Sequence, residues 1–271
     1  MTGGSWDERI ARAQQLSTTY PFAGEILRFY QRVAGAQAQV YACAHKACGD
    51  VRAQRPAGGL REELDLTLLL PEVRGFLGIL ERYGPAPVSD AARELAREGS
   101  AAWVALLTAW WADPGAEASE REQPARFCAR AFLEPYAQFL AEHTEPPVIE
   151  ITPSVCPMCG GKPQFGVLRP EGDGARRSLV CSLCATEWNY GRILCPACGQ
   201  DSETRLAVYV AEEVKQVRVE ACEECRTYIK TVDLSKDGHA VAVVDEIAAV
   251  PLDLWARENG YTKLKTNLMG M

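Results

Sequence analysis

Four cysteine pairs with the spacing C-x-x-C lie in the second half of this 271-residue chain, and they constrain its fold more than any other feature. Two residues between the cysteines let both sulfurs face one metal ion from a tight turn. A glycine after the second cysteine permits the positive backbone angle that such turns need, and two of the four pairs carry it. The pairs are Cys156/Cys159, Cys181/Cys184, Cys195/Cys198 and Cys222/Cys225.

The lengths of the intervening loops indicate which pairs share an ion. There are 21 residues between Cys159 and Cys181 and 23 between Cys198 and Cys222, enough in each case for a β-hairpin that returns the chain to the first turn. Proline and glycine at 170–174 predict the turn of the first hairpin. The spacing therefore predicts an internal duplication, with one module holding the first two pairs and a second module holding the last two.

Four thiolates around one ion suit zinc, and the same tetrahedral geometry suits a single iron as in rubredoxins. A bridged iron-sulfur cluster and a redox-active dithiol fit less well, because four equally spaced pairs separated by hairpins are typical of metal ribbons. An all-cysteine ligand set leaves no open position for a substrate, which favours a structural role. Iron that changes oxidation state, in a sensor or an electron relay, remains the functional alternative.

Cysteine usage and the absence of targeting signals indicate a cytoplasmic protein. Charged residues interrupt the first twenty positions, and no uncharged apolar run of about 18 residues occurs in the chain. Eleven cysteines in a small secreted protein would suggest disulfides, but eight of these stand in C-x-x-C pairs in a long chain. We therefore expect metal binding in the cytoplasm and no stable membrane insertion.

The charge balance disfavours nucleic acid as a partner. The formal net charge of the chain is −7. Residues 154–232, which contain all the paired cysteines, hold ten lysines and arginines against ten acidic residues. No basic block is concentrated there, as a nucleic-acid-binding ribbon would require.

Up to about residue 145 the pattern predicts helices. Apolar residues recur at three and four positions, and proline or glycine at Pro21, 55–59, 84–87, 113–115 and Pro124 separates five or six helices. The segment from Asp90 to Trp111 is predicted to be one helix that starts at an oxygen-bearing cap. Proline pairs near residue 146 mark the best domain boundary.

Beyond that boundary the pattern changes to strands. β-branched runs at 206–210, 217–219 and 227–232 predict a hairpin and a further strand, and two short helices are expected over 242–249 and 252–259. The predicted fold is α+β, with an N-terminal all-helical domain followed by two tandem rubredoxin-like or zinc-ribbon-like four-cysteine modules. The predicted limits are a helical domain at 1–145, a linker at 146–152, modules at 153–191 and 192–234, and C-terminal helices with a tail at 235–271.

The remaining chemistry-bearing residues are better explained by packing. Cys43, His45 and Cys48 could form a third metal cluster, but their helical offsets do not bring them together, and Cys128 also fits the core. An aromatic stripe could line a peptide groove, although such stripes at helical spacing are usually core. No catalytic constellation or nucleotide-binding motif is found, so we expect that the protein is not an enzyme. The stripe consists of Trp103, Trp110, Trp111, Phe127, Phe132 and Tyr136.

The segments 181–188 and 220–230, which surround the second cysteine pair of each module, resemble the FdhE family of formate dehydrogenase accessory (formation) proteins. The similarity extends to other parts of the chain and is most specific in the cysteine region. Outside that region it includes Arg9, Arg12, Leu16, Pro21, the run from Asp245 to Ala248, Leu252 and Asp253.

The resemblance implies assembly of another enzyme and no catalysis. FdhE-like proteins are cytoplasmic factors that bind the catalytic subunit of respiratory formate dehydrogenase and support its maturation before export. The resemblance further implies that all eight paired cysteines are metal ligands, with iron as the favoured metal and zinc as a possible one. It also places candidate contacts to the ligands or the partner at Thr186, Glu187, Trp188, Thr227 and Tyr228. A zinc-ribbon nucleic-acid-binding protein and a rubredoxin-like electron carrier are the competing functions, and the oligomeric state stays open.

Overall fold

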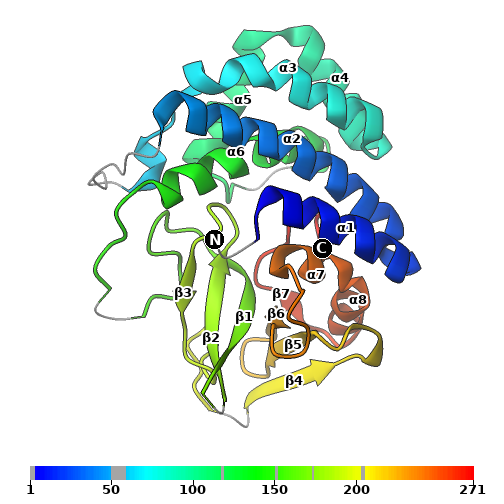
Figure 1. Cartoon of the computed structure of the whole chain (residues 1–271), viewed down its shortest axis with the longest axis vertical. Coiled ribbons are helices and arrows are strands. Elements are labelled where there is room, and N and C mark those ends of the chain that lie inside the picture. Colours follow the sequence, from blue (N-terminus) through cyan, green and yellow to red (C-terminus); the bar gives the residue numbers. More distant parts are fainter. Residues whose placement is uncertain (1–3, 50–58, 117–118, 150–151, 173, 203–204) are drawn as a thin grey trace. The chain divides into compact units, whose positions relative to one another are not determined.

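The computed structural model describes residues 4–49, 59–116, 119–149, 152–172, 174–202 and 205–271 (Figure 1). The chain forms two compact units, one made of Met1–Arg28 with Pro147–Met271 and the other of Phe29–Pro146. The limit near Arg28 falls inside the continuous helix α2 (Gly24–Cys48). The domain limits predicted from the sequence stay a prediction, because they follow motif and composition whereas these units follow compactness.

The unit of residues 29–146 is helical, as predicted. Its described part contains most of α2, and the aromatic residues of the predicted stripe pack inside it: the rings of Phe76 and Phe132 meet edge to face with centroids 5.3 Å apart. Trp103, Trp110 and Tyr136 are buried. The core interpretation of the stripe is therefore confirmed for these residues. The other helices are α3 (Leu66–Tyr83), α4 (Ala86–Glu98), α5 (Ser100–Ala112) and α6 (Gln123–Glu142).

The single helix predicted from Asp90 to Trp111 is wrong, because Gly99 divides it into α4 and α5. Gly99 has a φ of 86°, in the left-handed region that glycine adopts without strain. Its N–H still donates to the carbonyl of Leu95 at 3.3 Å and so closes α4. Helix α4 also begins earlier than predicted, directly after Pro85, because proline is tolerated in a first helical turn.

Three helices in the described part of the chain have the 18 or more residues that a membrane span needs. Helices α2, α3 and α6 contain 25, 18 and 20 residues. No helix in the described part of the chain has an apolar stretch long enough to span a membrane.

The unit of residues 1–28 and 147–271 is built on one mixed sheet in the order β3-β2-β1-β6-β5-β4, with β7 beside β6. The predicted hairpins are confirmed: β1 pairs with β2 and β4 pairs with β5, both antiparallel. Each hairpin connects two cysteine pairs, as the loop lengths predict. The strands are β1 (Pro163–Glu171), β2 (Gly174–Cys181), β3 (Glu187–Asn189), β4 (Leu206–Val210), β5 (Val217–Cys222), β6 (Thr227–Asp233) and β7 (Thr262–Lys263).

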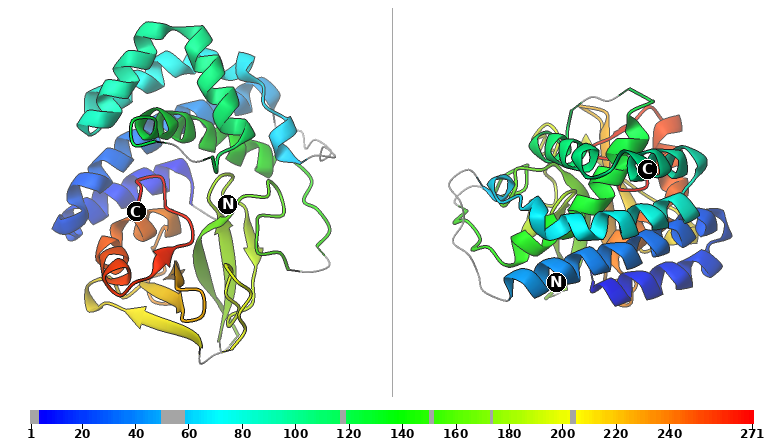
Figure 2. Two further views of the ribbon diagram at one scale, coloured as in Figure 1. Left: turned by 180° about the vertical axis from the view of Figure 1, so that it is seen from behind. Right: turned by 90° about the horizontal axis from the view of Figure 1, so that it is seen from above.

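The two modules are structural repeats that lie side by side in the sheet, and their strands follow the same order across it. The meander β1-β2-β3 corresponds to β4-β5-β6, because each begins after one cysteine pair and ends after the next. The modules join where β1 pairs with β6 in parallel, from Phe165 opposite Lys230 to Leu168 opposite Asp233. The first strand of one repeat therefore meets the last strand of the other, and β3 and β4 are left at the two ends of the sheet (Figures 1 and 2).

The junction between the modules requires a residue without a side chain at Gly166. A Cβ atom there would lie 2.4 Å from Oγ1 of Thr231 on the neighbouring strand β6. That distance is far inside van der Waals contact, so glycine permits the close approach of the two strands.

One face of the sheet is covered by α7 (Ala242–Ala248) and α8 (Val250–Glu258), which lie on one side of it in Figure 1. Both short helices were predicted and are confirmed. Leu252 of α8 packs with alternate residues of the strands, including Val167 and Val219, and all three are almost completely buried. Helix α1 (Trp6–Thr19) packs against α7 through an ion pair between Arg12 and Asp245.

Candidate metal centres

The first cysteine pair of each module lies in a tight turn that brings its two sulfurs to the same side. In the first module the N–H of Gly160 donates to the carbonyl of Cys156 at 2.8 Å, and the N–H of Cys156 donates to the carbonyl of Gly161 at 2.7 Å. Gly160 has a φ of 72°. The second module repeats the turn, since Gly199 has a φ of 77° and donates to Cys195 at 2.9 Å. Glycine is needed at both left-handed positions.

The second cysteine pair of each module adopts a similar turn without glycine. Ala185 and Arg226 directly follow these pairs, and both have a φ of 55°. Hydrogen bonds hold the strained residues in place: the N–H of Cys181 donates to Thr186 at 2.9 Å, and the N–H of Arg226 donates to Cys222 at 2.9 Å. The sequence marks only two of the four turns with glycine, although all four have a residue with positive φ after the second cysteine.

The four sulfurs of the first module converge on one point. Sγ of Cys156 lies 3.6 Å from Sγ of Cys184, and Sγ of Cys159 lies 3.4 Å from that of Cys181 and 3.5 Å from that of Cys184. All four ligand atoms lie within 4.8 Å of one another. We call this set the first cluster.

The last two pairs form the second cluster. Sγ of Cys195 lies 3.8 Å from Sγ of Cys225, and Sγ of Cys198 lies 3.7 Å from Sγ of Cys222. These four sulfurs also lie within 4.8 Å of one another. The structure therefore groups the pairs as the loop lengths predict.

The spacing of the sulfurs fits one tetrahedral ion in each cluster. A metal–sulfur bond of about 2.3 Å separates the corners of a tetrahedron by about 3.8 Å. The sulfur–sulfur separations of 3.4 to 3.8 Å match that value and exceed the roughly 2.0 Å of a disulfide bond. A bridged cluster of several irons would need ligands spread more widely. Thiolates suit zinc and iron alike, so the geometry fits either metal.

The backbone next to the clusters lies close to the sulfurs and donates hydrogen bonds to them. A Cβ atom at Gly161 would lie 3.1 Å from Sγ of Cys181 and 3.3 Å from Sγ of Cys159, tighter than ordinary contact. The N–H of Leu183 donates to Sγ of Cys181 at 3.4 Å, and the N–H of Ala197 makes the same bond to Cys195 in the second cluster. Amide donors of this kind stabilise negative charge on sulfur and would orient the ligands of a bound ion.

Burial makes the first cluster dependent on a cation if its sulfurs are to be thiolates. Cys181 and Cys184 are buried, and burial raises the pKa of both thiols well above its usual value. A divalent ion displaces the protons and pairs the resulting charges, so affinity for the ion and stability of the module are linked.

The second cluster is more accessible than the first. Cys198 is exposed and Cys225 is half-buried, whereas Cys156, Cys181 and Cys184 are buried. Burial acts to raise the pKa of Cys225, but hydrogen bonds with Thr227, Cys198 and Cys222 together outweigh it and lower that pKa to about 7. The two clusters thus share a ligand set and differ in their exposure to solvent.

The residues that the family resemblance singled out next to the ligands have different surroundings. Oγ1 of Thr186 lies 3.1 Å from Sγ of Cys184 and is in direct contact with a candidate ligand. Glu187 forms a salt bridge of 2.9 Å with Arg169. Trp188 is buried and donates to the carbonyl of Pro153 at 2.9 Å. Thr186 therefore fits a role beside the ligand, whereas Trp188 holds the segment just before the first cysteine turn through its bond to Pro153.

Tyr228 lies on the face of the sheet that α7 and α8 cover, in a buried ion cluster that the sequence did not predict. Its hydroxyl donates to Asp253 at 2.8 Å, and Nζ of Lys230 lies 2.6 Å from the same carboxylate. Lys263 and Glu246 complete the cluster with an ion pair of 2.6 Å. Two cations and two anions are thus paired where solvent is excluded. The available signal was the acidic pair inside the apolar run 242–249.

The other cysteines stay outside both clusters. Cys128 is buried, and burial raises its pKa to about 12, as expected for a core thiol. Sγ of Cys43 lies 3.5 Å from the carbonyl oxygen of Leu68, and Cys48 is exposed. Among the described residues, Cys43, His45 and Cys48 form no third cluster with metal-ligand spacing.

Two four-cysteine clusters on a shared sheet, preceded by a helical region, define a protein of the tandem rubredoxin-like or zinc-ribbon-like class. Family models described as "FdhE, central domain" and "FdhE, C-terminal domain" match residues 155–192 and 193–269. Over these residues the chain is similar to the FdhE family, as its cysteine motifs indicate.

Curated relatives and a solved structure show the same similarity. The chain is 37% identical over 147 residues to the FdhE homolog of Aquifex aeolicus, a match that covers 54% of this chain and 52% of the relative. The FdhE homolog of Pseudomonas aeruginosa is 36% identical over 124 residues, or 43% of this chain and 39% of that protein. These matches span about half or less of the relatives. The crystal structure of the P. aeruginosa FdhE protein superimposes with a TM-score of 0.70 at 26% identity and covers 98% of this chain and 96% of that one.

Proposed function

We propose that this chain is a non-catalytic accessory protein for the assembly of respiratory formate dehydrogenase. It binds the catalytic subunit in the cytoplasm, before export, and carries one metal ion in each cysteine cluster. The observation that carries the proposal is the match to FdhE proteins over the cysteine modules, together with a fold shared along nearly the whole chain with a solved FdhE protein.

The eight paired cysteines are the proposed metal ligands, four to an ion. Iron is the favoured metal, since the sulfur spacing accepts it and the family resemblance points to it; zinc fits the same geometry. When bound, the ion supplies cross-linking of each module and, if it is iron, a one-electron redox centre. The thiolates hold the ion, and the amide donors of Leu183 and Ala197 orient them.

A rubredoxin-like electron carrier is the second candidate function. It is favoured by one observation, the exposure of Cys198 in the second cluster, because electron transfer requires a centre close to the surface. Reversible loss and return of iron colour on reduction and oxidation of the purified protein supports this role. Colourless protein that contains only zinc removes it.

The decisive experiment is affinity capture from the chain's own host, grown with formate metabolism induced. Tagged wild-type protein is compared with a Cys156→Ser/Cys195→Ser variant, and bound proteins are quantified by mass spectrometry. Recovery of the formate dehydrogenase catalytic subunit with the wild type, reduced at least tenfold with the variant, supports the proposal. Recovery of nucleic acid or ribosomal material alone supports a zinc-ribbon nucleic-acid-binding protein, which the net charge of −7 disfavours.

A further inference from the structure

The repeat in the sheet leaves one strand edge covered in the first module and open in the second. Strand β1 is paired on both sides, by β2 and by β6. Its counterpart β4 pairs only with β5 among the described residues and ends the sheet. An edge strand presents the N–H and C=O groups of alternate residues to any extended chain that approaches it.

The side chains of β1 and β4 differ in exposure in the same way as the strand edges. Leu168 of β1 is 1% exposed, whereas Val210, at the corresponding position of β4, is 67% exposed. Both positions lie opposite an arginine of the next strand, Arg177 in the first module and Arg218 in the second. Val208 of β4 is also 52% exposed. Val208 and Val210 thus form an exposed apolar surface beside the open edge of β4. The equivalent surface of the first module, on β1, is covered.

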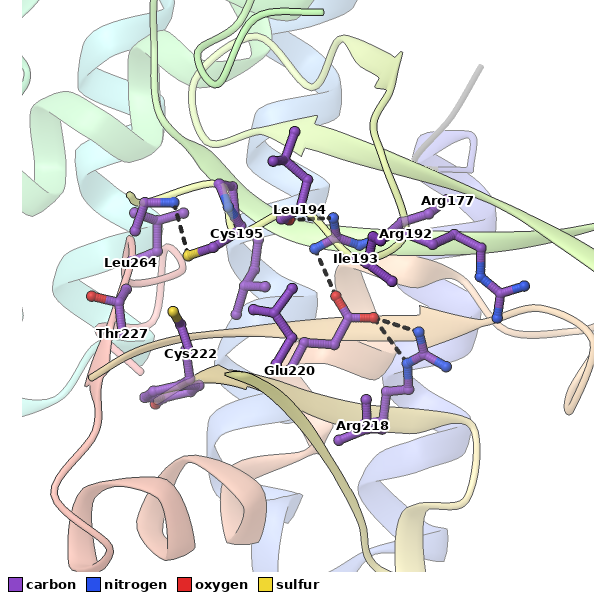
Figure 3. Close-up of a pocket in the computed structure, with 16 residues that line it drawn as sticks. Arg177, Arg192, Ile193, Leu194, Cys195, Arg218, Glu220, Cys222, Thr227 and Leu264 are labelled. Atoms are coloured by element: carbon purple, nitrogen blue, oxygen red, sulfur yellow. Dashed lines mark hydrogen bonds and ion pairs between the residues drawn. The ribbon is translucent and has the colours of Figure 1, made fainter. Parts of the chain in front are cut away.

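A cavity of about 470 Å³ lies beside this edge, on the face of the sheet away from α7 and α8. Its lining joins Leu206 and Val208 of β4 to Ile193 and Pro196 of the loop before it, with Cys195 and Cys222 of the second cluster at one end (Figure 3). The volume suits one or two apolar side chains of an extended peptide.

Charge at the other end of the cavity favours an acidic occupant. Figure 3 shows Glu220 between the guanidinium groups of Arg177 and Arg218, and the contacts are 2.6 and 2.9 Å. One carboxylate is therefore paired with two cations. Arg192 is exposed at the rim and has no acidic partner among the described residues. The buried Nε of Arg177 also lacks a hydrogen-bond acceptor within the described part of the chain. Three arginines against one carboxylate leave an excess of positive charge at this end of the cavity.

We infer that the β4 edge and this cavity form a docking site for an extended segment of a protein partner. The segment lies parallel to β4, as β6 lies parallel to β1, and pairs over residues 207–210, the counterparts of 165–168. It places an apolar side chain in the cavity and an acidic side chain against Arg192 and Arg218. Strand addition supplies backbone hydrogen bonds, and the cavity and the arginines supply selectivity.

A second copy of this chain is a poorer occupant than a different protein. By the repeat, the strand that would dock on β4 is the counterpart of β6, namely β3. Strand β3 has only three residues, Trp188 at its centre is buried, and Glu187 is held by Arg169. Docking of β3 on β4 would also continue from copy to copy and build an open filament.

The inference rests on the proposed function only for the identity of the partner, the formate dehydrogenase catalytic subunit. The first test places a photo-crosslinking phenylalanine analogue at Val210 and, as a control, at Leu254 of α8, which is 49% exposed in the same unit. Crosslinks from position 210 to one short, acidic and apolar segment of the captured subunit, absent from position 254, support the site. Capture with crosslinks from neither position or from both equally overturns it.

Charge and edge variants test the same site quantitatively. Val210→Asp and Arg192→Glu are expected to reduce capture at least tenfold, whereas Leu254→Asp leaves it unchanged. Metal content and the unfolding midpoint should equal those of the wild type in all three variants, because each side chain is exposed. Undiminished capture by Val210→Asp and Arg192→Glu overturns the inference.

A random decapeptide display library separates the docking site from the proposed function. If the wild type captures no formate dehydrogenase subunit, the proposed function fails, and the library still decides the inference. Enriched acidic and apolar peptides that lose binding to Val210→Asp support the docking site. Peptides that bind this variant equally, or no enrichment, overturn it. A dimer in light scattering that Val210→Asp dissociates also overturns it, because the occupant is then a second copy.

Discussion

Nη2 of Arg12 lies 2.6 Å from Oδ1 of Asp245, although the two residues are 233 positions apart. The side chain of Asp245 is completely buried, and that of Arg12 is 6% exposed. Arg12 also contacts Asp237 at 2.6 Å, and Gln216 donates to Asp245 at 2.9 Å. Helix α1 is therefore held to the C-terminal part of its unit by a hydrogen-bonded charge that solvent does not reach.

Arg12→Ala is expected to lower the free energy of unfolding by about 3 kcal/mol, because it leaves the Asp245 carboxylate buried without a cation. Urea denaturation followed by circular dichroism measures the loss. The matched control is Arg176→Ala in the same unit, since Arg176 is 44% exposed and its ion pair among the described residues is a long one, 3.7 Å from Glu171. The control should change stability by less than about 0.5 kcal/mol. Equal losses in both variants would contradict the role given to Arg12.

Cys156→Ser and Cys195→Ser are each expected to remove one of the two bound ions and leave the other. Loss of one thiolate lowers the affinity of its own cluster, while the sulfurs of the other cluster stay within 4.8 Å of one another. Elemental analysis of purified protein gives the number of ions per chain. Cys48→Ser, at an exposed cysteine outside both clusters, is the control and should keep two ions. Unchanged metal content in either cluster variant would refute the assigned ligands.

Zinc-loaded protein is expected to release its ions to a chelator in two phases, with the second cluster first. Cys198 is exposed, whereas three ligands of the first cluster are buried. Zinc transferred to a coloured chelator is recorded against time. Cys195→Ser should lack the fast phase and Cys156→Ser the slow one. A single phase, or the opposite assignment of the phases, would show that exposure of the ligands does not control release.

Gly166→Ala is expected to destabilise the protein by about 1 to 3 kcal/mol, because the added Cβ would lie 2.4 Å from Oγ1 of Thr231. Thr231→Ala removes the atom that clashes. The double variant should therefore be more stable than the sum of the two single losses predicts, by at least about 0.5 kcal/mol in a double-mutant cycle. Additive losses would mean that the two strands can separate without cost.

The buried ion cluster should make stability depend on acidity. Burial acts to raise the pKa of Asp253, but the charges of Lys230 and Lys263 and the hydrogen bonds from Lys230 and Tyr228 together outweigh it, so the folded-state pKa lies below its usual value. The contribution of Asp253 is therefore complete above the unfolded-state pKa of about 4 and is lost as the pH falls through the lower, folded-state pKa.

Asp253→Asn provides the measurement. The difference in unfolding free energy between wild type and variant should be constant above about pH 5 and shrink below about pH 4. Metal loss in acid affects both proteins and cancels in the difference. A difference that does not change with pH would show that Asp253 is not charged in the folded protein.

Local patterns were sufficient to predict the modules. The spacing of the cysteines, the lengths of the hairpins and the β-branched runs at 206–210 and 227–232 act over short distances along the chain, and the structure confirms them. The break at Gly99 was missed because apolar periodicity continues through it, and a single glycine does not always end a helix.

The pairings over long sequence distances could not be predicted. Nothing local in Phe165 or Lys230 indicates that β1 and β6 lie side by side, since parallel pairing depends on the placement of whole elements. The same holds for Arg12 with Asp245. The cavity beside β4 was missed for a related reason: its lining comes from four strands and two loops, and each part has an ordinary pattern by itself.

The unit that carries both cysteine clusters is discontinuous in sequence, and this affects the order in which it is completed. During synthesis α1 emerges first, and residues 29–146 follow before the strands and the α7 segment that contains Asp245. Arg12 therefore cannot pair with Asp245 until most of the chain has been made. The entropic cost of closing so long a loop also slows the docking of α1 on α7. The cysteine modules, whose contacts are local, can load their ions earlier. Metal incorporation should precede the last step of folding.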